Sequence, residues 1–367
     1  ANTYTQSQAD VLLAAKATVA NFTSTGIDDN ATSTAITIDS NENVTIGADD
    51  QLNMSGSHNE GGALINLKGT DTPAAGKNLG ALNFGNSTDA SLAMIRGLST
   101  ASDAADMLFF TEPSGGSIEE RMRINSSGNV GVGVTPESAW HSSLTALQLG
   151  GNASISAQTT QGSSKQAYFS QNLYNDGDQK YISTDEASEY RQQNGTHTFR
   201  VAPSGSADSA INWTTAMIID NAGIVTKPYQ PAFQVRGGSN VALPLQTYTI
   251  VNFNIETFDQ NSDFNTTTKT FTAPVTGKYQ FNVQILWGNW DSGANYYYLQ
   301  LQTSNRTYYE LFSGESRPGD PAYCYGHIHV LADMDAGDVA NVQIYQNQGN
   351  SQTTYDDQTI FTGNLVC

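Results

Sequence analysis

Positive charge is scarce in this sequence, which has 16 Lys and Arg residues against 35 Asp and Glu residues and a net charge of −19. A protein that binds DNA or RNA needs a basic patch to neutralise the phosphates. The scarcity of basic residues therefore argues against nucleic-acid binding. Self-repulsion at this net charge is expected to keep the protein soluble at low salt.

Cysteine is also rare, since the 367 residues include only Cys324 and Cys367. Two cysteines at this spacing form neither a zinc site nor a CxxC redox motif. We expect two free thiols, with a disulfide between them as the alternative. No signal peptide or transmembrane run is visible, so membrane insertion is not expected. The sequence begins at Ala1, which leaves open whether a leader or a longer N-terminal part precedes it.

Hydrophobic residues make up 38% and charged residues 14% of the chain, below the roughly 45–50% and about 25% of an ordinary globular domain. Ser, Thr, Asn, Gln and Gly fill the difference, yet 17 Tyr, 14 Phe and 4 Trp supply large apolar surfaces. This composition favours short β-strands joined by polar turns, in a thin structure with little core in each cross-section. Such a structure usually needs several chains that share one core.

Residues Tyr4 to Val19 are predicted to form a short helix, within an N-terminal helical segment of residues 1–25. Val11, Leu12, Ala15 and Val19 fall on one face by the 3.6-residue period. A narrow apolar stripe on an otherwise polar chain favours packing against copies of the same helix. The alternative is a frayed terminal helix, because about 15 residues are marginally stable alone.

Three segments repeat one pattern, a strand, a turn rich in Asx and Gly, and a second strand: Ala35 to Gly47, Met122 to Gly133 and Ala216 to Val225. This pattern is typical of a β-hairpin. The alternation of apolar residues leaves one apolar face on each hairpin, which a lone hairpin cannot bury. Three copies arranged around an axis would bury that face, so we expect a parallel homotrimer.

The stretches before the second and third hairpins also share an order of motifs. The first series is Leu82–Phe84, Met94–Arg96, Phe109–Phe110 and Pro113–Gly115, and the second is Tyr168–Ser170, Tyr181–Ser183, Phe199–Val201 and Pro203–Gly205. We predict two β-rich shaft modules, residues 26–133 and residues 134–228. After Pro228 the apolar runs become denser, and strands recur at the spacing of a sandwich or jelly roll.

Residues 229–367 resemble the C1q/TNF-like domain. The motifs, in order, are Pro231–Val235, Phe271–Val283, Leu331–Val339 and Ile360–Val366, and the second is similar to the family's strand-turn-strand "FtaPvsGvYyF". Pro274 and Gly277 bracket a tight turn, and Tyr279, Phe281 and Val283 alternate into a core. The resemblance implies a trimeric jelly-roll head.

The region before the head resembles the shaft of bacteriophage tail fibres, of the type predicted for marine phages. The motifs are Tyr4–Leu13, the hairpin Met122–Gly133, which is similar to "M.I.s.GNVGIG", and Ile182–Ser188. The Gly-X-Y stalk of animal C1q proteins is absent. The resemblance implies an extracellular virion fibre that docks to the tail or other virion proteins at its N-terminal end, with a head that binds a host surface glycan or protein. The recognisable docking domain of short-tailed phages is missing, so the attachment point is open.

Motifs of catalysis are absent, since the sequence has no GxGxxG loop, no GxSxG elbow and no HExxH. His327 and His329 alternate on a predicted strand but lack a third metal ligand. The adjacent acids Glu119-Glu120 and Asp356-Asp357 would point to opposite faces of a strand, unlike a glycosidase pair. We predict no enzyme and no cofactor, with Ca²⁺ held by Asp and Asn loops as an alternative that some C1q-like trimers suggest. Two further alternatives are a polysaccharide-depolymerising tailspike and a secreted C1q-like lectin or signalling protein.

Two loops of the head are the predicted receptor contacts. Aromatic faces beside amides and carboxylates are typical of sugar binding, and a Gly- and Pro-rich loop from Ser313 to Ala322 is the second candidate. The alternative is that alternate aromatics such as Tyr297 fill the core, and that the second loop is merely a connection. The candidate residues are Trp287, Trp290, Asp291, Asn295, Tyr296, Glu315, Arg317 and Asp320.

Overall fold

The computed structural model describes the backbone of residues 36–38 and 44–46, residue 67, and residues 74–367 apart from 87, 348, 350, 351 and 356. The chain divides into two compact units, Ala1–Lys68 and Gly69–Cys367. The predicted helix from Tyr4 to Val19 lies outside the described residues. In the described part the one helical element is the short 3-10 helix η1 (Gly314–Ser316). None of its helices is long and apolar enough to span a bilayer.

The described part of the first unit is a hairpin. Strand β1 (Ile36–Ile38) pairs antiparallel with β2 (Val44–Ile46), with Ile36 opposite Ile46. This pairing confirms the first of the three predicted hairpins.

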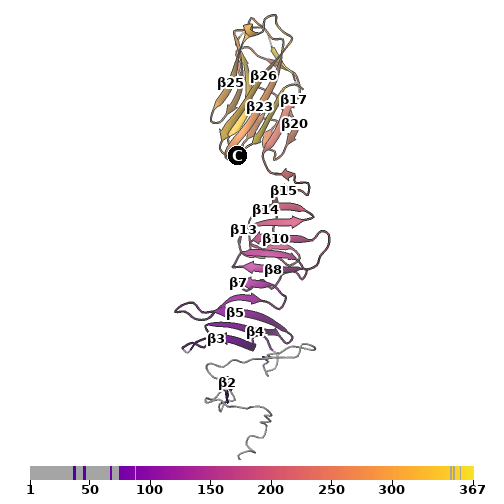
Figure 1. Ribbon diagram of the computed structural model, residues 1–367. Coiled ribbons are helices and arrows are strands. Elements are labelled where there is room, and N and C mark those ends of the chain that lie inside the picture. The colour runs from indigo at the N-terminus through magenta and orange to yellow at the C-terminus, as the bar shows by residue number, and fades with distance from the viewer. Residues whose placement is uncertain are drawn as a thin grey trace, which may run out of the picture. The chain divides into compact units, whose positions relative to one another are not determined.

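The second unit begins with a single sheet of twelve strands, which we call the shaft sheet (Figure 1). Its strands follow one another across the sheet in chain order, and all neighbours are antiparallel except β7 and β8. The strands are β3 (Asn78–Phe84), β4 (Ala93–Ala101), β5 (Ala104–Thr111), β6 (Glu119–Ile124), β7 (Val130–Val132), β8 (Leu144–Leu149), β9 (Ala153–Gln158), β10 (Gln166–Gln171), β13 (Asp185–Gln193), β14 (Thr196–Gly205), β15 (Thr214–Ile219) and β16 (Val225–Thr226). A separate hairpin is formed by β11 (Leu173–Asn175) and β12 (Gln179–Tyr181).

The other two predicted hairpins are β6–β7 and β15–β16, and their turns share one hydrogen-bond pattern. Asn125 Oδ1 accepts from the amides of Ser127 at 3.1 Å and Asn129 at 2.9 Å. Asp220 Oδ1 accepts from the amides two and four residues later, both at 2.9 Å. Gly128 and Gly223 take positive φ angles of 85° and 83°, which a glycine adopts without strain. Both hairpins are therefore confirmed.

The loose repeat of motifs corresponds to two series of five strands, with one correction. Strands β3, β4, β5, β6 and β7 correspond, in that order, to β10, β13, β14, β15 and β16. The predicted match between Met94–Arg96 and Tyr181–Ser183 is wrong, because Tyr181 ends the side hairpin β11–β12 while the partner of β4 in the second series is β13. The parallel step from β7 to β8 falls between the two series. The division of the shaft at residue 133 stays a prediction.

One face of the shaft sheet is covered by its own chain. The hairpin β11–β12 and the segments around Trp140 and Ile211 pack there against β8, β10, β13 and β14. The buried residues are Trp140, Leu144, Ala146, Tyr168, Leu173, Tyr174, Tyr181, Ala187, Ala202 and Ile211. This small core holds the second half of the shaft sheet together.

The opposite face carries apolar side chains in cross-strand register, which we call the apolar ladder. One row crosses six strands through Leu82, Ile95, Phe109, Met122, Val132 and Leu149. The adjacent row crosses nine strands through Met107, Ile124, Val130, Leu147, Ile155, Phe169, Tyr190, Phe199 and Met217. Both rows share a face, because members of one strand are two residues apart.

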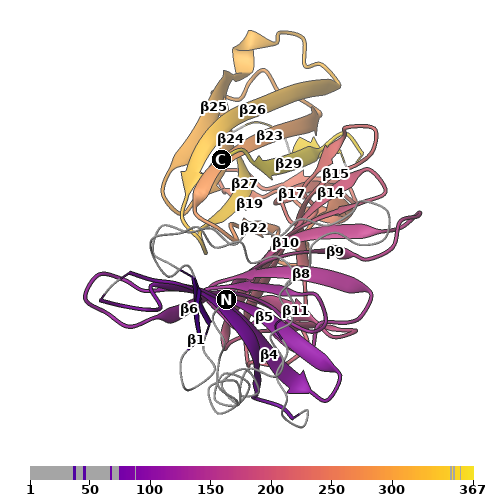
Figure 2. The ribbon, with the colours of Figure 1, turned by 60° about the horizontal axis from the view of Figure 1, so that its bottom comes forward.

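The apolar ladder remains accessible in the single chain. Phe169 is 55% exposed, Ile155 45% and Leu82 46%. Figure 2 shows the strands of the shaft sheet fanning out, as the twist of a sheet accumulates from strand to strand. An exposed apolar surface of this length is unusual for a monomeric protein.

The head consists of thirteen strands in two sheets. The β23 sheet has the order β18-β28-β23-β29-β17-β20, with β26 also paired to β23. The β24 sheet has the order β21-β22-β27-β24-β25, with β19 also paired to β27. The strands are β17 (Ala232–Gly237), β18 (Val241–Leu243), β19 (Thr249–Ile250), β20 (Phe253–Asp259), β21 (Phe264–Asn265), β22 (Thr270–Thr272), β23 (Gly277–Gly288), β24 (Tyr296–Thr303), β25 (Thr307–Ser313), β26 (Tyr323–Met334), β27 (Val339–Gln346), β28 (Gln352–Thr354) and β29 (Ile360–Leu365).

The two sheets of the head enclose one aromatic core, and the chain passes repeatedly from one sheet to the other. Phe233, Phe271 and Phe281 are fully buried, and the rings of Phe233 and Phe271 stack with centroids 4.9 Å apart. Tyr279, Phe281 and Val283 of β23 all point into this core, as the alternation in the sequence predicted. The predicted mainly β fold with a jelly-roll head is confirmed.

Candidate functional site

The two loops that carry the predicted contact residues lie against one another, and we call the pair the clasp. Residues 289–295 join β23 to β24, and residues 314–322 join β25 to β26. The Asn289 amide donates to the Ala322 carbonyl at 3.1 Å. The structure thus brings together two segments that the sequence offered as separate candidates.

Asp320 links the two loops through its carboxylate. Its Oδ1 accepts hydrogen bonds from the Ser292 hydroxyl at 2.6 Å and from the Ser292 amide at 2.7 Å. Both bonds lower the pKa of Asp320 below its ordinary value of 3.8, and the bond from the Ser292 hydroxyl has the larger effect. Because the pKa is lowered in the folded chain, the contact stabilises the clasp above pH 3.8 and is lost as the pH falls through the folded pKa.

Replacing Asp320 by glycine is expected to loosen the clasp without unfolding the head. Glycine suits the positive φ of 48° at this position, so the change removes the acceptor of the Ser292 amide and hydroxyl without straining the backbone. Without these hydrogen bonds we expect roughly tenfold faster amide exchange in the first loop of the clasp. Hydrogen–deuterium exchange of peptides from residues 289–295 at pH 7 measures this change.

The matched control is Glu315→Gly, which adds the same backbone freedom to the same loop. Glu315 is exposed, and its side chain forms no hydrogen bond or ion pair with the described residues. Exchange that is equal in both variants would show that the carboxylate of Asp320 does not hold the loops together.

Trp290 is buried in the clasp, which corrects the expectation that its ring faces a ligand. The side chain is 1% exposed, its indole N–H donates to the Gly314 carbonyl at 3.1 Å, and its ring centroid is 4.0 Å from that of Tyr297. Gly314 fits only as glycine, because a Cβ would lie 1.9 Å from the Ala294 carbonyl oxygen. The ring therefore anchors the clasp to the core of the head.

Trp287 is buried as well, so the prediction that it contacts a receptor is also wrong. It is 1% exposed and packs edge-on against Trp290 and Phe312. Tyr297, expected in the core, lies beside it and donates its hydroxyl to the Asp291 carbonyl at 2.8 Å. Burial raises the pKa of Tyr297 to about 12. Trp287, Trp290 and Tyr297 therefore pack in the core of the head and do not form a contact surface.

The other predicted contact residues keep accessible side chains. Arg317 is half-buried, donates to the Tyr325 carbonyl at 3.2 Å and lies 5.8 Å from the ring centroid of Trp290. Asp291 is also half-buried, and its Oδ1 accepts from the Gly293 amide at 2.7 Å. Together with exposed Glu315 and Asp320, these residues give the clasp a mixed charged surface. Their role in ligand contact stays a proposal.

Asn295, at the end of the first loop of the clasp, and Tyr296, at the start of β24, contact β27 and the residue that follows it. The Asn295 amide donates to Asn347 Oδ1 at 3.0 Å, and the ring of Tyr296 stacks on Tyr345 with centroids 6.0 Å apart. Tyr345 lies on β27, and reasoning from the sequence did not single it out. The pairing of β24 with β27 brings these tyrosines together, and only the alternation of Tyr296 with Tyr298 hinted at a shared face.

His327 and His329 share the outer face of β26, as their alternation predicted. Their rings stack with centroids 6.1 Å apart, and His329 Nδ1 is 2.9 Å from Asn282 Oδ1. Among the residues that the structure describes, no group of three or more His, Cys, Asp or Glu side chains is placed to hold a metal ion. Calcium binding and the absence of a cofactor both stay predictions.

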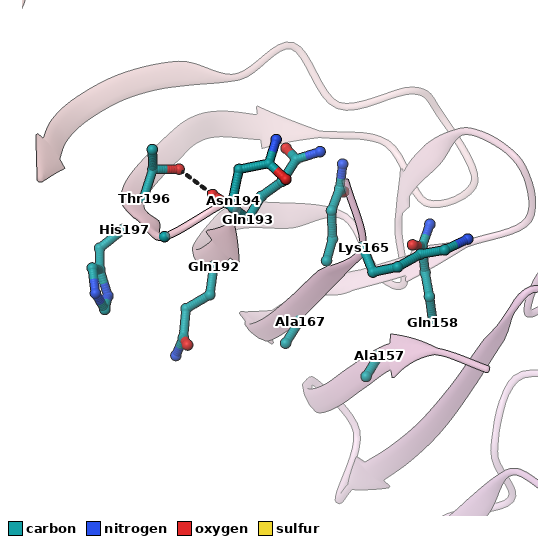
Figure 3. Close-up of a pocket in the computed structure, with 11 residues that line it drawn as sticks. Ala157, Gln158, Lys165, Ala167, Gln192, Gln193, Asn194, Thr196 and His197 are labelled. Carbon is teal, nitrogen blue, oxygen red and sulfur yellow. Dashed lines mark hydrogen bonds between the residues drawn. The ribbon is translucent and has the colours of Figure 1, made fainter. Parts of the chain in front are cut away.

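A shallow pocket lies where β9 and β13 end and β10 and β14 begin, within the shaft sheet (Figure 3). Lys165, Gln158, Gln192 and His197 surround it, and the Thr196 hydroxyl donates to the Gln193 carbonyl at 2.6 Å. None of the residues that line this pocket is a carboxylic acid. A glycosidase requires two carboxyl groups flanking the bond to be cleaved, and this pocket does not supply them.

The predicted acids Glu119 and Glu120 serve as ion-pair partners on β6. Glu119 pairs with Arg121 at 2.8 Å, and Glu120 pairs with Arg123 at 2.7 Å. Arg123 also contacts buried Asp106 at 3.0 Å. The two carboxylates therefore do not face one another, as the alternation of a strand predicts.

Both cysteines are free thiols, as expected. Cys324 is buried beneath the clasp, and Cys367 is exposed at the end of the chain. Burial raises the pKa of the Cys324 thiol, which keeps it protonated and unreactive at neutral pH.

Comparisons with known proteins concern the head. Residues 232–366 match the family model of the C1q domain. Among solved structures, the globular domain of zebrafish complement 1qA is 18% identical, with 38% of this chain and 98% of that chain covered and a TM-score of 0.29. Murine APRIL is 11% identical, with 37% and 99% covered and a TM-score of 0.28. The Eiger TNF of S. frugiperda is 12% identical, with 38% and 94% covered and a TM-score of 0.28. The search of curated proteins found no match.

Proposed function

We propose that this chain is a homotrimeric bacteriophage fibre protein whose C1q-like head attaches the virion to the host-cell surface. The N-terminal end joins the tail or another virion protein, and the head is the part that meets the cell. The protein works by binding alone, with no catalytic step and no cofactor. Its place is the extracellular surface of the virion.

The apolar ladder is the observation that carries the proposal. In one row it crosses nine of the twelve strands of the shaft sheet. It lies on the face opposite the small core around the β11–β12 hairpin, and Phe169 and Ile155 are 55% and 45% exposed there. Burial of apolar surface contributes about 25 cal/mol per Å². Threefold symmetry would place three ladders around one axis and give each the partner it lacks, without leaving an open end for further chains to join.

The C1q match supports the same symmetry at the other end of the chain. C1q and TNF-like domains commonly form homotrimers and bind ligands. Shaft and head would then share one threefold axis. Three heads at the end of one fibre present three identical sites, so that weak contacts gain from avidity.

The assignment to a phage rests on the sequence of the shaft. The segment Tyr4–Leu13 and the hairpin of β6 and β7 resemble fibre motifs, and this type of hairpin occurs three times along the chain. A secreted C1q-like lectin is the rival, and it would share the head without needing a virion. The two are distinguished by where the protein is found.

Antibody raised against the full chain tests the proposal on purified particles of a phage that encodes this sequence. We expect gold label at the tip of a tail or fibre. We also expect phage adsorption to fall when free protein is added to the cells. Unlabelled particles would contradict the virion role. Shortened host polysaccharide after incubation with the protein would instead support the depolymerising tailspike.

A further inference from the structure

The outer face of the β24 sheet carries a group of five tyrosines from three strands and one loop, which we call the tyrosine face. Tyr296 and Tyr298 lie on β24, Tyr309 on β25 and Tyr345 on β27, and Tyr248 precedes β19. Tyr298 pairs with Tyr345 on one side and with Leu311 on the other. Their neighbours Tyr297 and Leu299 point into the core, so the tyrosines point outward.

The rings of Tyr248, Tyr345, Tyr298 and Tyr309 follow one another across the face, and Tyr296 lies against both Tyr345 and Tyr298. Ring centroids are 4.7 Å apart for Tyr248 and Tyr345, 5.2 Å for Tyr296 and Tyr298, and 5.7 Å for Tyr298 and Tyr309. Tyr309 is 65% exposed and Tyr248 50%. None of the five hydroxyl groups forms a hydrogen bond with a described residue, so all remain available to a ligand. Aromatic surface of this extent is seldom left exposed without a function.

Amide side chains continue this face where the tyrosines end. Gln300 and Gln302 follow Tyr298 on β24, opposite Gln343 and Asn341 of β27. Gln343 Nε2 donates to Gln302 Oε1 and, at 3.1 Å, to Asn341 Oδ1. These bonds join the three amides, and each amide keeps further donors or acceptors for a ligand.

The described strands of this face present no charged side chain outward, although the chain as a whole carries a net charge of −19. Its outward residues are Tyr296, Tyr298, Gln300, Gln302, Thr307, Tyr309, Leu311, Asn341, Gln343 and Tyr345. An anionic or cationic ligand would find no counter-charge here. An aliphatic partner would leave the hydroxyl and amide groups buried without hydrogen bonds, which is costly.

We propose that the tyrosine face binds an uncharged glycan of the host surface. The apolar C–H face of a pyranose ring stacks on a tyrosine ring, while the tyrosine hydroxyls and the glutamine amides pair with sugar hydroxyls. Several rings in a row suit an extended chain of sugars rather than a single residue. This inference deepens the proposed attachment function and rests on it for its biological role.

Isothermal titration of the full chain with neutral hexaoses (cellohexaose, maltohexaose and mannohexaose) tests the inference, with oligogalacturonate as the charged probe. We expect binding of at least one neutral hexaose that is unchanged between 50 mM and 500 mM salt, because no ion pair contributes. Tyr309→Ala and Tyr248→Ala should each weaken that binding about tenfold. Tyr229→Ala, which removes an equally exposed tyrosine elsewhere, is the matched control and should bind like the parent chain.

Four results would overturn the inference. The first three are no binding of any neutral hexaose, preference for oligogalacturonate, and undiminished binding by both tyrosine variants. A change in the mass of the assembled protein on Tyr309→Ala would also overturn it, because the face would then be a contact between copies. If the antibody labels virions but the protein binds no glycan, the glycan site is refuted and the fibre role stands. If the protein binds the glycan but is absent from virions, the fibre role is refuted and the glycan site stands.

Discussion

Replacing Phe169 by aspartate is expected to open the shaft while leaving the head folded. Phe169 lies within the apolar ladder between Ile155 and Tyr190 and is 55% exposed in the single chain. The fold of one chain therefore loses little, whereas in a trimer three carboxylates would meet at the axis. An unpaired buried charge costs several kcal/mol, so cleavage of the shaft by a protease should accelerate by roughly 100-fold.

Limited proteolysis with mapping of the cut sites measures this effect, and Ser163→Asp is the matched control. Ser163 is exposed in a loop of the same shaft, so the control adds the same charge away from the ladder. Equal resistance of Phe169→Asp and the parent chain would mean that the ladder faces solvent, and the trimeric shaft would be wrong.

Replacing Trp290 by alanine is expected to lower the free energy of unfolding of the head by about 3–5 kcal/mol, the usual cost of removing a buried aromatic side chain. The Gly314 carbonyl loses its donor, and Tyr297, Trp287 and Phe312 lose a ring they touch. For a domain of this size the melting temperature should fall by about 10 °C. Differential scanning calorimetry of the full chain measures it.

Trp290→Phe serves as the graded comparison, since it keeps most of the packing and loses the hydrogen bond, and it should destabilise by about 1–2 kcal/mol. Tyr309→Ala, an exposed ring on the tyrosine face, should leave the melting temperature unchanged. If the Trp290→Ala variant melts at the same temperature as the parent chain, the burial of Trp290 in the core is contradicted. Trp290 would then again be a candidate contact residue.

Local signals in the sequence predicted the hairpins well. Asn125 and Asp220, each followed three residues later by glycine, specify a turn by side-chain bonds to the next few amides, and this chemistry needs no distant partner. The alternation of Tyr279, Phe281 and Val283 likewise placed the core of the head.

Contacts between segments far apart in the chain could not be predicted from the sequence. The apolar ladder is a product of register between strands, and the hairpin of β11 and β12 interrupts the repeat that would have revealed it. Trp290 was misplaced because it looks like part of a polar loop, whereas Gly314, more than twenty residues later, provides the space and the carbonyl that hold it in the core. The tyrosine face needed the pairing of β24 with β25 and β27.

The most direct test of the trimeric fibre is the mass of the full chain in solution. Native mass spectrometry at successive dilutions should show a particle of three times the 39.3 kDa chain mass that persists at nanomolar concentration. A folded, stable particle of 39.3 kDa would contradict the account, because the apolar ladder would then have no partner.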